Sequence, residues 1–532
     1  MTAVSRALTA RYTLTGELVA VSPLHIGAAA TGATIDLEHV RDGLDRLVIP
    51  GTSLAGVLRT VLSSEDRRDG WWGTHLTGHA EKDTAAHASR ITIADAASTA
   101  DARVVRRDGV SIDRITAAAA HRHLFTREVV TTGTRFTFSA WLEVAESGDD
   151  AAAAALMARL GARLTAGITA GAAGNAGLGR LRLEQPVLRR EDFTTPAGLF
   201  DALTTGGSVL EIDQPAPAAG RLRVTIPWRP LGAVMSKVAS ASGEAAAWPA
   251  LDSDATGTSL VLLIPGTSIK GILRAHAERI VRTLTGTAAV DTVDPLVQLA
   301  AAASLPGIGE LFGAAGDLAA GETGRKGLLS VGEVTSTVEV PADLWQRVRA
   351  ASAQAVTRGD RDRRRTEFAD AVDALNAVTG PQGLWFDIAA RTAIDRWTGA
   401  ASDGLLFTAL EPHTVAGADV WSPIHLDIDL TRIPPDAPVP VEALVTLVLL
   451  LARDLAEGWI PLGYATTRGL GAVRAETSAI TVTLDTGPDH HVGAALRALD
   501  GHTLHDILTS PELADRLEDA WRAAIFIGVR QS

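Results

Sequence analysis

The sequence contains no cysteine among its 532 residues, so disulfides and thiolate metal sites are excluded. Long hydrophobic runs are missing too. The longest, VEALVTLVLLLA at 441–452, is too short to span a bilayer, and Arg453 and Asp454 follow it. We interpret it as a buried core helix. The opening residues, MTAVSRALTARYTLTG, lack the apolar stretch of a signal peptide. We therefore expect an intracellular, cytoplasmic protein with no membrane partner.

A general excess of positive charge is also absent. The formal net charge is −13, which argues against a protein that binds nucleic acid through an overall basic surface. A local basic groove on an acidic body remains compatible with this composition. The length is sufficient for two or three domains with large cores.

An internal repeat is the most informative feature of the chain. IPGTSLAGVLR at 49–59 returns as IPGTSIKGILR at 264–274, with eight of eleven positions identical. Further pairs follow in the same order: Trp72-Gly73 with Phe312-Gly313, SIDR at 111–114 with AIDR at 393–396, and GNAGLGRLRL at 174–183 with TRGLGAVRA at 467–475. Such ordered self-similarity predicts a tandem duplication of one domain.

Hydrophobic periodicity predicts the elements of each copy. In the first copy, residues 11–21 and 133–145 alternate as strands. The helix after Pro50-Gly51 carries an apolar stripe that includes Leu54 and Leu58, and AAAAALMARLGARLTAG reads as a second helix. A glycine turn then leads into the strand LGRLRLEQ. Strand, helix, strands, helix and strand is the order of a ferredoxin-like unit, so we predict an α+β fold.

These patterns define a domain plan. We expect a first domain at 1–190, a linker at 191–219 and a second domain at 220–480. The second domain carries a helical insert at about 340–380, and a partly helical extension covers 481–532. Five arginines in the insert are compatible with either a solvated helix face or an RNA contact: Arg358, Arg361, Arg363, Arg364 and Arg365.

Two motifs predict anion binding. A strand, Pro-Gly, two hydroxyl residues and a helix place bare backbone N–H groups at a helix N-terminus. In the second copy Lys270 and Arg274 add a basic strip beside it, whereas the first copy keeps Arg59 but has Ala55. Ordinary turn and capping chemistry is the alternative. The two glycine turns lead into strands, so they are no dinucleotide fingerprint, but they permit close approach of backbone to a phosphate or base.

Together these motifs resemble the RAMP superfamily of CRISPR-associated proteins, most of all the Csm- and Cmr-type backbone subunits of type III effector complexes. The resemblance rests on IPGTSxxGxLR, on a Trp-Gly or Phe-Gly pair before a strand, on IDR and on the final glycine turn. It covers most of 11–185, which also contains PLHIGAAATGATID at 23–36, and about 220–475 in the same order.

The resemblance implies two tandem ferredoxin-like (RRM-like) domains that hold guide RNA by backbone and shape. It also implies thumb hairpins after IDR, at about 115–130 and 397–412, that wedge between bases. The expected partners are guide (crRNA) RNA, complementary target RNA and other effector subunits. The residues expected to bind RNA are His25, Thr52, Ser53, Arg59, Arg114, Gly177, Gly179, Arg180, Thr267, Ser268, Lys270, Arg274, Arg396, Arg468, Gly469 and Gly471.

The same resemblance implies that Asp36, in ATIDLEH, cleaves target RNA. A lone carboxylate can hold Mg²⁺ at the scissile phosphate or deprotonate the attacking 2′-hydroxyl. The alternative is an ordinary loop acid, like Glu38, Asp42 and Asp45. The second copy has no such motif in the corresponding loop, where Asp252 and Asp254 are the only candidates.

Three functions therefore remain open. The first is a type III backbone subunit that binds guide RNA and cleaves target RNA as a metal-dependent endoribonuclease, a hydrolase of antiviral defence. The second is a backbone subunit without cleavage. The third is a guide-processing endoribonuclease of the same superfamily, in which His25 could serve as a general base. A core position is the alternative role for His25.

Overall fold

The computed structural model describes residues 7–28, 35–61, 70–73, 88–99, 102–116, 118–145, 149–214, 220–239, 245–316, 324–352, 358–433, 437–485 and 493–529. Contacts divide the chain into two compact units. Unit 1 comprises Met1–Arg106, Arg127–Gly174 and Leu178–Pro217. Unit 2 comprises Arg107–Thr126, Asn175–Gly177 and Ala218–Ser532. The segment 107–126, which the sequence analysis assigns to the first domain, thus packs with the second repeat.

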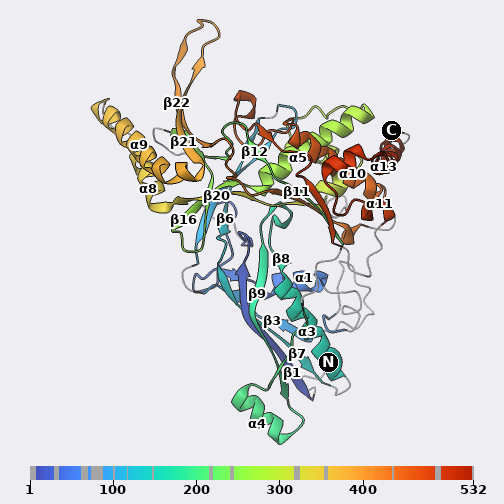
Figure 1. Cartoon of the computed structure of the whole chain (residues 1–532). Coiled ribbons are helices and arrows are strands. Elements are labelled where there is room, and N and C mark those ends of the chain that lie inside the picture. Colours follow the sequence, from blue (N-terminus) through green and yellow to red (C-terminus); the bar gives the residue numbers. More distant parts are fainter. Residues whose placement is uncertain are drawn as a thin grey trace. The chain divides into compact units, whose positions relative to one another are not determined.

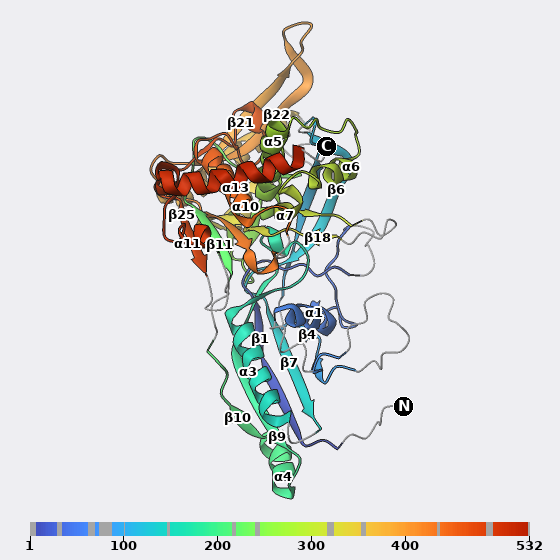
Figure 2. The ribbon, with the colours of Figure 1, turned by 90° about the vertical axis from the view of Figure 1, so that its right-hand side faces the viewer.

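Unit 1 contains the expected ferredoxin-like sheet. Its strands are β1 (Ala10–Ala20), β3 (Ile91–Ile93), β7 (Arg135–Val144) and β9 (Arg180–Asp192), in the antiparallel order β9-β1-β7-β3. Helix α1 (Gly51–Val61) lies between β1 and β3 in the chain, and α3 (Asp150–Ala166) between β7 and β9. Figure 2 shows α3 running along the sheet, where it packs on β9 and β1.

Alternation in the sequence explains this sheet. In β7, Phe136, Phe138, Ala140 and Leu142 all point into the core and are at most 2% exposed. Between them the side chains face the other side of the sheet, as the two-residue period of a strand requires. In α1 the predicted stripe places Leu54 and Leu58 in the same core with no exposed surface.

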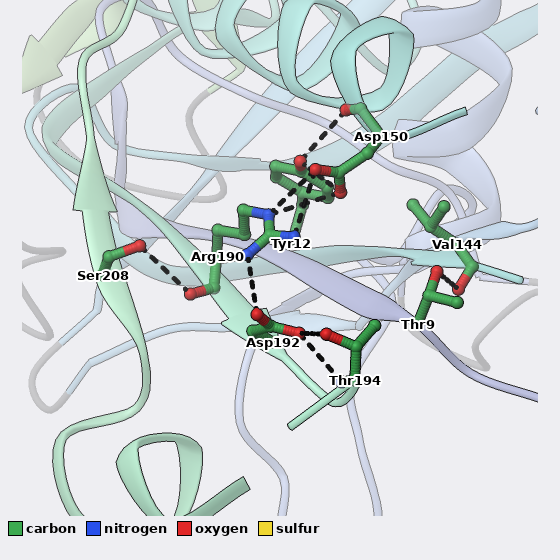
Figure 3. Close-up of polar contacts among 8 residues, drawn as sticks. All are labelled: Thr9, Tyr12, Val144, Asp150, Arg190, Asp192, Thr194 and Ser208. Atoms are coloured by element: carbon green, nitrogen blue, oxygen red, sulfur yellow. Dashed lines mark hydrogen bonds and ion pairs between the residues drawn. The ribbon is translucent and has the colours of Figure 1, made fainter. Parts of the chain in front are cut away.

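A polar cluster closes one end of the sheet (Figure 3). The buried Tyr12 of β1 donates a hydrogen bond to Asp150 at the start of α3 (2.8 Å), and Arg190 of β9 pairs with the same carboxylate (3.1 Å). Burial, and then the hydrogen bond to Asp150, raises the pKa of Tyr12 to about 12. Beyond Arg190, Thr194 donates to Asp192 (2.6 Å). These bonds fasten the first strand, the second helix and the last strand together.

The region between the repeats contains a helix and a strand. Helix α4 (Pro196–Thr205) follows β9, and Thr195 caps it by accepting from the N–H of Gly198. Strand β10 (Ser208–Leu210) then returns to pair with β9 at the edge of the sheet. The first unit therefore extends well into the range 191–219 given to the linker.

The second repeat builds the same sheet again. Its strands are β11 (Arg221–Ile226), β19 (Leu329–Val331), β23 (Ile424–Asp429) and β25 (Thr481–Asp485), in the order β19-β23-β11-β25. Helices α5 (Gly266–Thr285) and α10 (Val441–Ala456) occupy the places of α1 and α3. Matching elements in chain order give the same ferredoxin-like topology in both repeats. The expected α+β fold is thereby confirmed.

The final strand of the second sheet lies beyond the predicted limit at residue 480. The glycine turn leads only into the short β24 (Val473–Arg474), which pairs with β12 (Arg229–Pro230). The chain then turns before β25 pairs with β11. Pro227 explains the break between β11 and β12, and so the break between their partners β25 and β24, because proline has no N–H to donate to a sheet. In the first repeat, β1 runs without interruption.

The remaining elements of unit 2 surround this sheet. The predicted insert consists of α8 (Ala342–Ala351) and α9 (Arg358–Thr379). Near α5 lie α6 (Pro295–Ala303) and α7 (Ile308–Phe312). Further strands are β13 (Lys237–Ala239), β14 (Ala245–Pro249), β15 (Leu251–Ser253), β16 (Ser259–Ile264) and β20 (Val334–Pro341). The chain ends in α11 (Ala494–Arg497), α12 (Leu504–Thr509) and α13 (Pro511–Val529).

Each repeat carries one long hairpin, with the IDR motif at its turn. In the first repeat the strands are β5 (Val104–Ile112) and β6 (Ala119–Val130). In the second they are β21 (Leu384–Ile394) and β22 (Ala401–Thr414). Figure 1 shows the β21–β22 hairpin projecting beyond the other elements of unit 2.

The longest apolar run forms α10, and it is the core helix that the sequence predicts. Twelve of its residues are buried, among them Leu444, Leu447 and Leu451. Within the described part of the chain, we find no helix with the length and apolar character needed to cross a membrane.

Candidate functional site

The glycine of each IPG motif has a packing role. At Gly51 a Cβ would collide with the carbonyl oxygen of Ile93, and at Gly266 with those of Ala176 and Val331. Each helix therefore starts against the strand beside it. The N–H of Gly51 also donates to the Asp95 carboxylate (2.7 Å), so α1 already has an anion at its N-terminus.

The start of α5 is surrounded by cations. Thr267 and Ser268 are exposed there. One turn on, Lys270 donates to the carbonyl oxygen of Leu329 (2.8 Å). Arg432 donates to the carbonyl of Gly327 (2.6 Å) and pairs with Asp429 (2.9 Å).

Electrostatic interactions add a third cation, Lys326, to Lys270 and Arg432 near the start of α5. Burial, and then the charges of Arg274, Lys326 and Arg432, together lower the pKa of Lys270 to about 7. Burial and Arg432 likewise lower the pKa of Lys326. We call Lys270, Lys326 and Arg432 the cation cluster. A phosphate would relieve the repulsion among these charges, so the cluster suits an anion.

Arg274 is near enough to lower the pKa of Lys270, but its guanidinium is held by other protein groups. It pairs with Glu278 (2.9 Å) and donates to the carbonyl of Leu299 (3.2 Å). Glu278 also lies 3.7 Å from Arg114 of the first hairpin. Arg114 and Arg274 are largely buried against protein groups, so we leave both out of the proposed RNA contacts.

The glycine turns are required by the backbone itself. Gly177, Gly179, Gly469 and Gly471 all have φ between 81° and 97°, a region that other residues rarely adopt. A Cβ at Gly179 would collide with the carbonyl of Ala170, and one at Gly471 with that of Leu462. This packing accounts for the motif in both repeats without an RNA contact.

An aromatic platform lies beside the second glycine turn. Lys237 and the exposed Arg468 both approach the ring of Tyr464, each at 5.3 Å from its centroid. Aromatic rings next to cations are the usual components of a surface that binds single-stranded RNA. Of these three residues, the sequence analysis identified only Arg468.

The other expected contacts lie at the surface or close to it. Thr52, Arg180 and Arg396 are exposed, and Ser53 and Arg59 are half-buried. Side chains of Arg358 and Arg361 lie outside the described residues. In α9, Arg363 and Arg364 pair with Glu367, as on a solvated helix face.

His25 is a core residue rather than an RNA contact. It is 2% exposed, and its Nδ1 lies 2.7 Å from the carbonyl oxygen of Glu128. His39, 1% exposed, accepts from the N–H of Ile26 through its own Nδ1 (3.1 Å). Burial lowers the pKa of both rings, that of His39 to about 4.

These two histidines predict a loss of stability in mild acid. Because the folded pKa of His39 lies below its unfolded value, stability is complete above about pH 6.5 and falls as the pH drops towards 4. We expect unit 1 to lose about 2 kcal/mol between pH 7 and pH 5. Hydrogen exchange of the β1 amides would measure this. His39→Asn should reduce the pH dependence, and an equal dependence in both proteins would contradict the assignment.

Asp36 lies in the expected loop and its side chain is exposed. Nearby acids have arginine partners: Asp42 pairs with Arg46 (2.7 Å), and Glu128 with Arg41 (3.3 Å). Among the described residues no group of three potential ligands could hold a metal ion. A single carboxylate suits Mg²⁺ only where substrate phosphates and water complete its coordination, and an exposed Asp36 is compatible with that arrangement.

The two second-copy candidates have structural roles. Asp252 is 7% exposed and pairs with Arg107 (3.0 Å), which also pairs with Glu333 (2.5 Å). Asp254 accepts from Thr256 (2.6 Å) and from the N–H of Gly257 (2.8 Å), so it shapes a turn. Asp252 therefore lacks the exposure of Asp36, whereas Asp254 is exposed but engaged within its own turn.

When the chain is compared with protein families, one family model matches it. The model of the RAMP superfamily matches residues 17–182. No curated protein matches the chain. A similar solved chain comes from a type III-B Cmr-beta complex, determined by cryo-EM in the apo state. The two are 15% identical, over 34% of this chain and 98% of that one, with a TM-score of 0.26.

Proposed function

Because residues 17–182 belong to the RAMP superfamily, we propose that the chain is a guide-RNA-binding backbone subunit of a type III CRISPR effector complex. Its partners would be guide RNA, complementary target RNA and other effector subunits. The proposal further assigns cleavage of target RNA to the first repeat, with Asp36 as the catalytic carboxylate.

The cation cluster carries the RNA-binding part of the proposal. Lys270, Lys326 and Arg432 interact electrostatically beside a helix N-terminus, where only Arg432 forms an ion pair, with Asp429, among the described contacts of these three cations, and Thr267 and Ser268 are exposed at that terminus. The arrangement offers ionic and hydrogen-bond contacts to a phosphate but no base edge to read, as a sequence-independent guide contact requires. Lys237, Tyr464 and Arg468 would add a stacking surface in the same unit.

Asp36 supports the cleavage part through its exposure and through the nature of its loop. Mg²⁺, when bound with RNA, would stabilise charge at the scissile phosphate. Asp36 would hold that ion or accept the proton of the attacking 2′-hydroxyl. The second repeat would bind without cleaving, because Asp252 is held in a buried ion pair.

Two alternatives differ in testable ways. A backbone subunit without cleavage would bind guide and target equally well but leave the target intact. A guide-processing endoribonuclease would need an accessible general base, and a His25 that is 2% exposed does not provide one. We therefore retain only the first of these as a competitor.

The depressed pKa of Lys270 predicts pH-dependent RNA binding. A bound phosphate favours the protonated amine, so affinity should be highest below pH 7 and fall by about tenfold between pH 6 and pH 8. Lys270→Arg should abolish this dependence, because arginine stays protonated. Filter binding of guide RNA at several pH values would measure it.

Salt titration provides the control for that experiment. Lys270→Ala should lower the slope of log affinity against log salt by roughly one. Arg516→Ala is the matched control, because it removes an arginine of α13 that pairs with Glu512 (2.8 Å), and its slope should not change. If Lys270→Ala behaves like this control, the cluster does not bind RNA.

Cleavage is tested by Asp36→Ala in the assembled complex with labelled target RNA and Mg²⁺. Loss of the carboxylate should slow cleavage ~10²-fold or more while guide and target binding persist. Asp254→Ala is the control and should change little. A cut that persists in Asp36→Ala, or disappears only in Asp254→Ala, would contradict the assignment. An intact target with the unmodified chain would favour the non-cleaving subunit.

A further inference from the structure

A groove opens within unit 2, between α5 and the end of α10. One wall is the face of α5 from His276 to Leu284, and the other contains Arg453, Asp454, Glu457 and Trp459. We call it the α5–α10 groove. Its volume is about 460 Å³, which lies in the range of sites that hold a small ligand. None of the RNA contacts proposed above lines it.

A chain of polar groups holds one arginine in this groove. The exposed Arg279 donates from Nη2 to Nδ1 of His276 (2.8 Å). Because arginine has no acceptor atom, Nδ1 must accept, and the proton of the imidazole is therefore on Nε2. Nε2 donates to Asp454 (2.6 Å), which also pairs with Arg453 (2.7 Å). His276 and Asp454 are each only 8% exposed, so buried groups orient Arg279.

The same chain leaves the charge of Arg279 available. Burial alone would raise the pKa of Asp454, but the hydrogen bonds from His276 and Arg453 outweigh burial and lower that pKa. The charge of Asp454 is thus balanced by Arg453. Among the contacts of the described residues, the neutral imidazole of His276 is the partner of Arg279. The remaining N–H groups of this guanidinium can bind an anionic group of a ligand.

The other wall of the groove presents an aromatic ring in a fixed orientation. Trp459 is 67% exposed. Its indole N–H nevertheless donates to Glu457 (3.1 Å), and its backbone N–H donates to the carbonyl of Asp454 (2.8 Å). An exposed indole that is held in this way can stack on a planar ring.

Glu457 adds an acceptor next to that ring. One of its carboxylate oxygens takes the indole N–H of Trp459. The other lies 3.9 Å from Arg453, which is beyond hydrogen-bond distance. This second oxygen can therefore accept from a hydroxyl group. Ile280 and Leu284 supply apolar surface to the same groove.

We propose that the α5–α10 groove binds a nucleotide with a terminal monophosphate. The base would stack on Trp459, a ribose hydroxyl would donate to Glu457, and the phosphate would bind Arg279. Inorganic phosphate would use only the arginine, and an uncharged apolar ring only the tryptophan. A free mononucleotide and the 5′-phosphorylated end of an RNA share the required chemistry. The proposal goes beyond the proposed function, because none of the guide-RNA contacts lines this groove.

Equilibrium dialysis of the full chain with labelled AMP, in the absence of RNA, tests this site. AMP should bind about tenfold more tightly than adenosine, which has no group for Arg279. Trp459→Ala should weaken AMP binding about tenfold or more through loss of stacking. Trp397→Ala is the matched control, because that tryptophan is 96% exposed on the β21–β22 hairpin, and it should leave AMP binding unchanged.

Two more variants assign the parts of the ligand. Arg279→Gln should reduce the affinity for AMP to that for adenosine and leave adenosine binding unchanged. Glu457→Ala should remove the preference of the chain for AMP over 2′-deoxy-AMP. Both side chains are exposed, so the melting temperature of each variant should stay within a few degrees of that of the unmodified chain.

Short RNAs that compete with AMP distinguish the two sources of the ligand. If an RNA with a 5′-monophosphate displaces AMP and the same RNA with a 5′-hydroxyl does not, the RNA end is the ligand. If neither displaces it, the ligand is a free mononucleotide.

Three results would overturn the proposal. They are equal retention of AMP and adenosine, no retention of AMP at millimolar concentration, and an effect of Trp397→Ala as large as that of Trp459→Ala. Lys270→Ala should bind AMP normally, so this proposal and the proposed guide-RNA contacts fail separately.

Discussion

The buried carboxylates that receive the first hairpin organise unit 2. Glu333, Asp252 and Glu278 all lie in the second repeat, yet their partners Arg107 and Arg114 come from the first. Burial lowers the pKa of Arg107, but Glu333 and Asp252 outweigh it and raise that pKa above its usual value. Burial also raises the pKa of Glu333, despite Arg107. Breaking such a buried pair leaves an uncompensated charge and is strongly destabilising.

This constraint separates the roles of the arginines in the motifs. Arg114 and Arg274 are largely buried, and both interact with Glu278 inside the protein. Lys270, Lys326 and Arg432 instead repel one another, and among the described contacts only Arg432 forms an ion pair, with Asp429. Cations with few counterions attract RNA, and cations held by buried acids fix the fold. The motif residues therefore divide into those held inside the protein and those that remain available to a ligand, a difference that spacing alone does not reveal.

The two repeats have the same topology but different surfaces. The first has Asp36 in the loop after its first strand, and the second has Lys237 there, beside Tyr464. The first hairpin is fixed within the chain, and the second is exposed at its turn. Duplication of a fold leaves the core under the same packing rules, while loops and tips are free to diverge.

Sequence determined the architecture because the core obeys short-range rules. Alternation in β7, the apolar stripe of α1 and the run that forms α10 each follow from the period of one element. Asp36 and Lys270 were also candidates from the sequence, through motif and position. The sequence analysis missed the interruption at Pro227 and the strand β25, because pairing partners decide where a strand ends.

Only the tertiary structure decided what the polar residues do. Lys326 and Arg432 join Lys270 from segments 56 and 162 positions away in the sequence, and no local pattern links them. His25 is buried, and Asp252 is paired, because other strands and the first hairpin cover them. Helix and strand periods are local, but burial and charge pairing depend on which distant segments meet. The sequence therefore specified the two ferredoxin-like sheets, and the folded chain specified which of its charges remain available to a partner.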